Sequence, residues 1–446
     1  MNTPICDFVK KYAEGKASRP HMPGHKGKGF LGFEHLDITE VEGADVLYNA
    51  EGIIKESMKN ASSLFGTAKT LYSTEGSSLS IRAMLYLTAL YAKEQQQKPL
   101  ILAGRNAHKA FLSGVALSDI EVEWIYPDEN EGLLSLCITP EKLESYLENY
   151  SEKPVSLYVT SPDYLGNTLD IEALSNVCKK HNMLLLVDNA HGAYLNFLPE
   201  NRHPIALGAD ICCDSAHKTL PVLTGGGYLH ISESAPEIFK TQAEGAMSLF
   251  ASTSPSYLIL QSLDTANRYM AEGYKEGLSA FIEKVDNLKH TLIRKGYGLF
   301  GNEALKLTIS AKEYGYKGYE LAEILAKNGI ICEFADSDFL TLMFTPENSV
   351  SDLEKLENTL LSVEKREALT SVFPKNVKLK RAMSIREALF SSSCEVSSKD
   401  AEGKILANYT VSCPPAIPIA ICGEIITKEA IETFLYYGIE KIRIIN

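Results

Sequence analysis

An aspartate and a lysine each follow a buried apolar run, and these two residues are the first candidates for chemistry. Asp188 ends the run "LLLVD", and Lys218 comes shortly after the run "ICCD". If both runs are strands of one parallel sheet, both side chains emerge at the edge where such sheets bind ligands. The two residues could form a structural ion pair. Alternatively, the lysine could form a Schiff base with pyridoxal phosphate while the aspartate keeps the pyridine nitrogen of that cofactor protonated.

The second interpretation requires a site for the cofactor's phosphate and a partner for its ring. Gly76, Ser77 and Ser78 stand just before a run of apolar residues with helical spacing. Small residues at a helix N-terminus offer backbone N–H groups and hydroxyls to an anion, but they are also typical of an ordinary N-cap. His108 follows the apolar run at 99–104 and could stack on a planar ring, although a loop histidine is more often solvated.

Residues around the lysine extend this pattern. Ser215 and His217 could reach the same phosphate, and the glycines at 225–227 leave room for close approach of the backbone. The stretch "HKT" is similar to part of a nucleotide-binding P-loop, but the glycine that must precede the lysine is absent, which excludes that interpretation.

Composition and charge exclude several classes of protein. The chain of 446 residues is long enough for two or three domains and a water-excluding core. A net charge of -13 argues against nucleic-acid binding, because that function requires clustered lysine and arginine. The start of the chain lacks the apolar segment of a secretory signal, and no stretch is apolar over the roughly 18 to 20 residues that span a bilayer. We therefore expect a cytoplasmic protein that contacts no membrane.

The cysteines favour a reduced protein without a metal site. Nine cysteines are scattered along the chain, and no CxxC pair occurs. An odd number without such spacing is not typical of a disulfide framework or of a zinc site. We expect reduced thiols in the core, as in the run "ICC" at 211–213.

The elements that must position these residues alternate between strands and helices from about residue 60 to 235. Buried runs rich in β-branched residues followed by helical patterns predict a parallel sheet covered by helices. The predicted strands lie at 99–104, 122–127, 155–162, 183–190, 209–216 and 226–231.

The remainder of the chain predicts a helical connector and two smaller parts. The connector runs from about 255 to 296. A small α+β domain should follow, with strands at 304–311, 330–336 and 339–346 and helices at 319–329 and 352–364. From about 371 onward we expect a third, small module, because the prolines of "SCPPAIPIAICGE" cannot serve a central strand.

Nine short stretches, in a fixed order, cover nearly the whole chain. They are "RPHMPGHKG" (19–27), "DITEVEGADVL" with "EGIIKES" (37–57), "TEGSS" (74–78), "NAHKA" (106–110), "TSPDYLG" (160–166), "DNAHGAYL" (188–195), "DSAHKTL" (214–220), "STSPSYLILQSLD" (252–264) and "CPPAIPIAICGE" (413–424). In this order the chain resembles the bacterial ornithine/lysine/arginine decarboxylases, fold-type I pyridoxal phosphate enzymes in their short form, without an amino-terminal receiver-like domain.

The resemblance implies an α/β fold with three parts. Residues 1–296 would be a large domain similar to aspartate aminotransferase, with an amino-terminal arm and a mostly parallel seven-stranded sheet that binds pyridoxal 5'-phosphate. Residues 297–370 would be a small α+β domain, and residues 371–446 a carboxy-terminal decarboxylase module. The decameric assembly associated with the receiver-like domain is not expected.

The resemblance also implies a role for individual residues. Lys218 is expected to be the Schiff-base lysine, Asp188 the partner of the pyridine nitrogen and His108 the residue that stacks on the ring. Glu424 would help select the distal cation of the substrate. The other expected cofactor-binding residues are Gly76, Ser77, Ser78, His191, Ser215, His217 and Thr253, the last reaching the phosphate of the neighbouring subunit in a homodimer with shared active sites.

The implied reaction is decarboxylation of ornithine, lysine or arginine to the corresponding amine and CO₂, as in polyamine biosynthesis. Reprotonation at Cα is assigned to either Lys218 or His108. Two alternatives remain open. One is another pyridoxal phosphate reaction, although "KLTISAKEYGYKGYELAEILAKNG" lacks the arginine that aminotransferases use for the α-carboxylate. The other is a non-catalytic cofactor-binding relative, because Asp163, Asn189 and Tyr194 depart from the family pattern.

Overall fold

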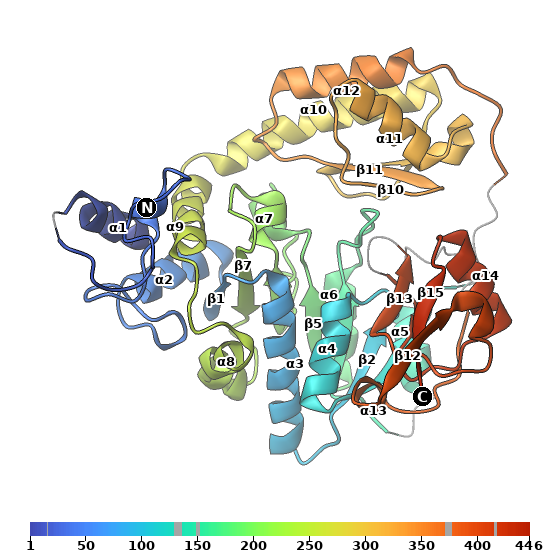
Figure 1. Ribbon diagram of the computed structural model, residues 1–446, viewed down its shortest axis with the longest axis horizontal. Coiled ribbons are helices and arrows are strands. Elements are labelled where there is room, and N and C mark those ends of the chain that lie inside the picture. Colours follow the sequence, from blue (N-terminus) through green and yellow to red (C-terminus); the bar gives the residue numbers. More distant parts are fainter. Residues whose placement is uncertain (16, 129–135, 149–151, 371–376, 414–416) are drawn as a thin grey trace. The chain divides into compact units, whose positions relative to one another are not determined.

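The computed structural model describes residues 1–446 apart from 16, 129–135, 149–151, 371–376 and 414–416 (Figure 1). The chain forms two compact units, each assembled from three segments. The first unit contains Met1–Ile101, Ser151–Val159 and Ile171–Lys275, and the second contains Leu102–Tyr150, Thr160–Asp170 and Glu276–Asn446. The division into domains at 296 and 370 stays a prediction.

A seven-stranded sheet has the order β1-β7-β6-β5-β4-β2-β3. Strand β7 runs antiparallel to both β1 and β6, whereas β5 and β6 are parallel. The strands are β1 (Lys69–Ser73), β2 (Leu100–Gly104), β3 (Glu121–Ile125), β4 (Ser156–Thr160), β5 (Leu184–Asp188), β6 (Ile211–Asp214) and β7 (Gly227–Ile231). The predicted mostly parallel sheet is therefore confirmed.

All six predicted strands of this sheet form, and each begins and ends within two residues of its predicted limits. Strands β3, β4, β5 and β6 end two residues earlier than predicted, whereas β2 and β7 end where predicted. The sequence reasoning missed β1, whose five residues include Lys69 and Thr70 and therefore lack a continuous apolar run.

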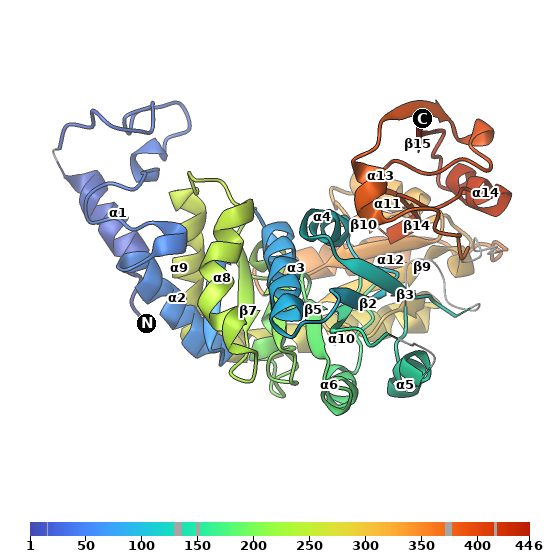
Figure 2. The same cartoon turned by 90° about the horizontal axis from the view of Figure 1, so that it is seen from below.

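Helices accompany the strands in both units. Helices α3 and α8 lie side by side (Figure 2). The helices as far as α10 are α1 (Pro4–Glu14), α2 (Ile53–Phe65), α3 (Ser77–Glu94), α4 (Lys109–Ser118), α5 (Pro140–Glu148), α6 (Ile171–Lys180), α7 (Ala216–Thr219), α8 (Glu237–Phe250), α9 (Tyr257–Ala271) and α10 (Tyr274–Lys295). The predicted connector is thus two helices, interrupted where Gly273 adopts a φ of 89°.

The second unit contains an antiparallel sheet in the order β10-β11-β9-β8. Its strands are β8 (Gly298–Phe300), β9 (Lys306–Ser310), β10 (Phe334–Ala335) and β11 (Phe339–Met343). Helices α10, α11 (Gly318–Lys327) and α12 (Val350–Ser362) lie on one side of it (Figure 1). The predicted strand at 330–336 is wrong in length, since only two of its residues pair.

The chain from residue 377 onward adds two small antiparallel sheets around an apolar cluster that includes Leu406, Phe434 and Ile442. Its elements are α13 (Ile385–Leu389), β12 (Ser393–Ser397), β13 (Thr410–Cys413), β14 (Ile417–Ile421), α14 (Lys428–Tyr436) and β15 (Lys441–Ile445). Strand β14 pairs with β13 alone, so Pro418 does not interrupt a central strand, as its sequence led us to expect.

The thiols and the helices bear on two further expectations. Among the described residues five cysteines are buried, but Cys137 and Cys394 are exposed, so the expectation that all are core thiols is wrong for these two.

No helix in the described ranges has both the length and the apolar composition for a transmembrane segment.

Candidate active site

Lys218 lies on the single turn of α7, which begins immediately after β6 and Ser215. Its Nζ is 3.0 Å from Nε2 of His191, a largely buried side chain that follows β5. Because an ammonium group only donates, a neutral imidazole with a free Nε2 lone pair is the partner that this contact requires. The lysine amine is therefore held at the end of the sheet by a titratable neighbour.

Asp188 is the last residue of β5, and its carboxylate is buried. Its Oδ2 accepts a hydrogen bond of 3.2 Å from the hydroxyl of Tyr158, and its Oδ1 accepts one of 3.2 Å from the backbone N–H of Ala190. Burial and the nearby carboxylate raise the pKa of Tyr158 well above its usual value, so this hydroxyl stays a donor. The Sγ of Cys213, the register partner of Asp188 on β6, lies 3.6 Å from Oδ1.

The N-terminus of α3 faces the turn that carries Lys218. Gly76 is the N-cap of α3, with a φ of 68°, and has no side chain with which to cap the helix. The hydroxyl of Ser215 donates to that of Ser77 at 2.8 Å. The Nδ1 of His217 is 2.9 Å from the carbonyl oxygen of Gly226, to which it donates. Two hydroxyls and the N–H groups of a first helical turn, which have no acceptor within their own helix, therefore gather here.

The glycines before β7 accommodate protein backbone. The N–H of Gly76 donates to the carbonyl of Gly225, which has a φ of 99°. A Cβ atom at Gly227 would lie 2.8 Å from the carbonyl oxygen of Asp214 and 3.3 Å from the backbone nitrogen of Ser77. The close approach that these glycines permit is therefore that of β6 and the start of α3.

The remaining predicted cofactor residues occupy different surroundings. Ser78 is half-buried in the first turn of α3, and Thr253 is exposed in the segment between α8 and α9. The neighbouring Ser252 donates its N–H to the carboxylate of Glu75, which ties this segment to the loop before α3. His108 belongs to the second unit, where it is the N-cap of α4 and its Nδ1 accepts from Ala110. The cofactor contacts assigned to these residues stay predictions.

The carboxylate of Glu424 forms a buried ion pair. Its two oxygens form a bidentate pair with the guanidinium of Arg105, at 2.9 and 2.8 Å, and Oε2 also accepts from the N–H of Ile421. Both side chains are about 5% exposed. The rings of Trp124 and Tyr126 each lie 5.3 Å from the guanidinium carbon. The carboxylate of Glu424 is thus already paired, and its part in selecting the substrate's distal cation stays a prediction.

Two of the three departures from the family pattern have a local structural role. The carboxylate of Asp163 accepts from the backbone and side-chain N–H groups of Asn167, each at 2.8 Å, and so closes the turn after β4. Burial raises its pKa. The amide of Asn189 donates to Oδ1 of Asp214 at 2.7 Å. Tyr194 is fully buried in a short 3₁₀ turn at Ala193–Phe197.

Sequence reasoning missed Tyr158, Arg105 and the partners of Asp214. Tyr158 and Arg105 stand inside or just after apolar runs, where a polar side chain needs a buried partner, and this was a usable signal. The partner itself could not be identified, because Glu424 is more than 300 positions from Arg105.

Comparison with known proteins places the chain in a family. Residues 3–310 match the family model described as "Orn/Lys/Arg decarboxylase, major domain". The uncharacterized protein YaaO of Bacillus subtilis is 30% identical over 97% of this chain and 93% of its own length. An arginine decarboxylase of the same organism is 29% identical over 96% of this chain and 92% of its own.

Solved structures share the fold of the chain. The crystal structure of the Francisella novicida lysine decarboxylase LdcF superimposes with a TM-score of 0.80 at 18% identity, covering 100% of this chain and 81% of that protein. The prediction of an α/β fold similar to aspartate aminotransferase is thereby confirmed. The chain belongs to the Orn/Lys/Arg decarboxylase family of amino acid decarboxylases.

Proposed function

We propose that this chain decarboxylates a basic amino acid with pyridoxal 5'-phosphate bound through Lys218. The observation that carries the proposal is the grouping at the ends of β5 and β6. There, an amine contacts His191, the buried carboxylate of Asp188 accepts two hydrogen bonds, and Ser215 joins the N-terminus of α3.

The donor set of the first unit fits this cofactor. Its phosphate would be held by the first-turn N–H groups of α3 and by the hydroxyls of Ser77 and Ser215, because a dianion needs several converging donors. Its pyridine nitrogen would pair with Asp188, whose position is fixed by Tyr158 and the N–H of Ala190. Gly76, Ser78, His217 and Thr253 complete the phosphate site in this proposal, and His108 the ring stack.

When bound, pyridoxal phosphate supplies an electron sink for the bond that breaks at Cα. The residues of the chain do the remaining work. Lys218 would hold the cofactor through its side-chain amine. His191, at 3.0 Å from Nζ, can take or return a proton at that amine. Asp188 keeps a proton on the facing nitrogen, and Lys218 or His108 returns a proton to Cα.

The proposed substrate class is that of the basic amino acids. The relatives include proteins named arginine decarboxylase and solved structures named lysine decarboxylase, so arginine, lysine and ornithine are the compounds to test. A homodimer with shared active sites and a place in polyamine biosynthesis belong to the same proposal. Selection of the distal cation by Glu424, whose carboxylate is paired with Arg105, belongs to this proposal as well.

The test is product identification with mapping of the cofactor bond. The purified protein, loaded with pyridoxal phosphate, is incubated with each of the three amino acids, and the amine and CO₂ are measured. Borohydride reduction followed by digestion should place a pyridoxyl tag on Lys218. The variant Lys218→Ala should lose both the tag and at least about a thousandfold of activity, whereas the exposed Lys179→Ala should retain both. A keto acid in place of CO₂, or a tag on another lysine, would contradict the proposal.

A further inference from the structure

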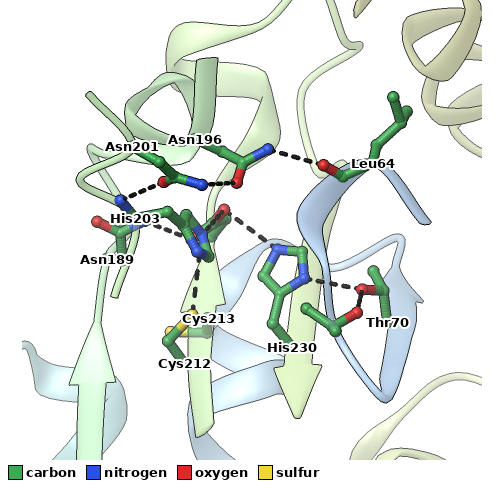
Figure 3. A network of polar contacts seen from close by, with 12 residues as sticks. Leu64, Thr70, Asn189, Asn196, Asn201, His203, Cys212, Cys213 and His230 are labelled. Carbon is green, nitrogen blue, oxygen red and sulfur yellow. Dashed lines mark hydrogen bonds and ion pairs between the residues drawn. The ribbon is translucent and has the colours of Figure 1, made fainter. Parts of the chain in front are cut away.

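A buried cluster behind the candidate site contains one carboxylate and two imidazoles. Oδ2 of Asp214, the last residue of β6, lies 3.1 Å from Nε2 of His203 and 3.2 Å from Nε2 of His230. Figure 3 shows His203 and His230 approaching from the segment before β6 and from β7. All three side chains have an exposed fraction of 0%. The cluster is therefore a polar network inside the core.

The hydrogen bonds of the cluster fix which atoms donate. Each histidine donates its Nε2 proton to the carboxylate, and Nδ1 of His230 lies 2.9 Å from the hydroxyl of Thr70. The two histidines hold the pKa of Asp214 below its usual value against the opposing effect of burial, and burial lowers the pKa of His230. Asp214 is thus an ionised acceptor with three donors, since Asn189 donates to its Oδ1 at 2.7 Å.

The same three residues also have the atom types of a metal site, but their geometry favours hydrogen bonding. A closed structural zinc site uses four ligands, and an open site needs a water position beside three. In the described part of the chain, the fourth nearby ligand atom is Sγ of Cys212, at 3.9 Å from Nε2 of His203. Phe65 packs against His203 and His230 with ring centroids at 5.3 and 4.5 Å, so an aromatic ring lies against both imidazoles.

The cluster is joined to the candidate site by Asn189. Strands β5 and β6 are in register as far as Asp188 and Cys213. One residue further, the backbone N–H of Asn189 donates to the carbonyl of Cys213 at 3.0 Å, and its side-chain amide donates to Asp214. Asn189 directly follows Asp188, and Asp214 directly precedes Ser215 and the turn of Lys218. A side-chain bond therefore continues the pairing where the two strands end.

The amide of Asn189 has one orientation that satisfies this geometry. Its Nδ2 must face the carboxylate, because a flipped amide would bring two acceptors together at 2.7 Å. Its Oδ1 is then buried and has no hydrogen-bond partner among the residues that the structure describes. A buried oxygen without a partner destabilises the folded state. The hydrogen bond from Asn189 to Asp214 is therefore the contact that can offset this cost.

We propose that His203, Asp214 and His230 act through Asn189 as a positioning network that sets the carboxylate of Asp188 relative to the amine of Lys218. The inference rests on the proposed function and assigns no direct contact with substrate to these four residues. The histidines hold Asp214, Asp214 holds Asn189, and the bond between them keeps the ends of β5 and β6 from separating.

The test breaks the Asn189–Asp214 bond from both sides. Asn189→Ala removes the donor. In Asp214→Asn, whichever way the new amide turns, one of its N–H groups faces another donor. We expect each variant to lose about tenfold or more in kcat with KM changed by less than about threefold, because the reacting groups are displaced while the binding surface stays intact. The double variant should lose no more than the worse single one, because both act on one bond.

A readout independent of turnover is the pH midpoint at which the visible absorbance of bound pyridoxal phosphate changes. It should shift in both single variants, since it reports the surroundings of the Lys218 bond. Asp210→Asn is the matched control. Asp210 precedes β6 and accepts from the N–H of Leu185 at the opposite end of the same strand pair. This variant should lose stability but keep the kcat and the absorbance midpoint of the wild type.

The outcomes separate the two proposals. If Asp214→Asn and Asn189→Ala behave as Asp210→Asn does, the network has a structural role alone and the inference is wrong. Stoichiometric metal in the wild type that is lost in Asp214→Asn would also overturn it. If Asp214→Asn does not fold, Asn189→Ala decides, because it leaves the carboxylate and both histidines in place. A wild type without the Lys218 tag or without CO₂ release would instead overturn the proposed function.

Discussion

Two carboxylates, one in each unit, are almost equally buried but are neutralised in different ways. Glu424 of the second unit faces Arg105, a side chain that stays charged at every pH at which proteins fold. Asp214 of the first unit faces two imidazoles and an amide, whose charge depends on pH or is absent. The difference teaches that burial alone does not decide how a carboxylate behaves; the kind of donor around it does.

Asp264 of the first unit extends this comparison to a carboxylate without a cation. It accepts from the backbone N–H groups of Ile5 and Cys6 at the start of α1 and from the hydroxyl of Ser57. Burial outweighs these neutral donors and raises its pKa to about 6. Asp214 shifts in the opposite direction, because its histidines can carry positive charge.

The largest effect is expected from Arg105→Met, which leaves Glu424 buried without its partner. The free energy of unfolding should fall by about 3–5 kcal/mol, the usual cost of an uncompensated buried charge, as measured by urea denaturation. Adding Glu424→Leu should recover much of this loss, because a buried pair can be replaced by apolar side chains at little cost. The control Arg202→Met breaks an exposed pair with Glu200 and should cost less than about 1 kcal/mol. Equal losses of stability in Arg105→Met and Arg202→Met would contradict the contrast between the buried and the exposed ion pair.

An intermediate effect is expected from the pH dependence of His230→Gln. Because the folded-state pKa of His230 lies below its usual value of 6.5, the unfolded state binds the proton first as the pH falls. The wild type should therefore lose stability below about pH 6.5, by at most about 1.4 kcal/mol per pH unit from this residue. The variant should show a shallower slope between about pH 6.5 and 5. An unchanged slope in the denaturation series would show that His230 is not the group responsible.

An effect of similar size but opposite sign is expected from Asp264→Asn. A carboxyl whose pKa is raised to about 6 stabilises the folded state at low pH, and this stability is lost as the pH rises from about 4 through about 6. The variant should therefore gain about 2–3 kcal/mol relative to the wild type at neutral pH compared with pH 4, since each pH unit between the unfolded and the folded pKa contributes about 1.4 kcal/mol. The exposed Asp400→Asn should show no such pH-dependent difference. If Asp264→Asn instead loses relative stability toward neutral pH, the carboxylate is held ionised by its donors.

The strands of the large sheet could be predicted because their apolar runs are continuous, as in Leu184–Asp188 and Ile211–Asp214. Strand β1 could not be predicted, because Thr70 is polar. Its hydroxyl forms a hydrogen bond with His230, which lies on a strand far along the chain. The two-residue strand β10 shows the same limit, since Phe334 and Ala335 pair only where β11 reaches them. The local sequence pattern therefore predicts a strand when the strand's own side chains are apolar, and fails when the strand depends on a distant partner.

The candidate site follows the same rule. Lys218, Asp188 and Ser77 could be singled out because each stands at the end or start of an element with a readable pattern. His203 and His230 look like isolated polar residues in the sequence, and the acceptor they share becomes visible only when β6 and β7 pair. The ion pair of Glu424 with Arg105 could not be predicted either, because it depends on the tertiary fold.

The interleaving of the two units affects synthesis on the ribosome. All three segments of the first unit have been translated once residue 275 is reached, so that unit can complete its core early. The segments Leu102–Tyr150 and Thr160–Asp170 of the second unit are made by then. The rest of that unit, residues 276–446, is translated only after a delay. At about 5–20 residues per second this delay is on the order of ten seconds or more. Arg105, in the first of these segments, therefore lacks its buried partner Glu424 until nearly the whole chain has been made.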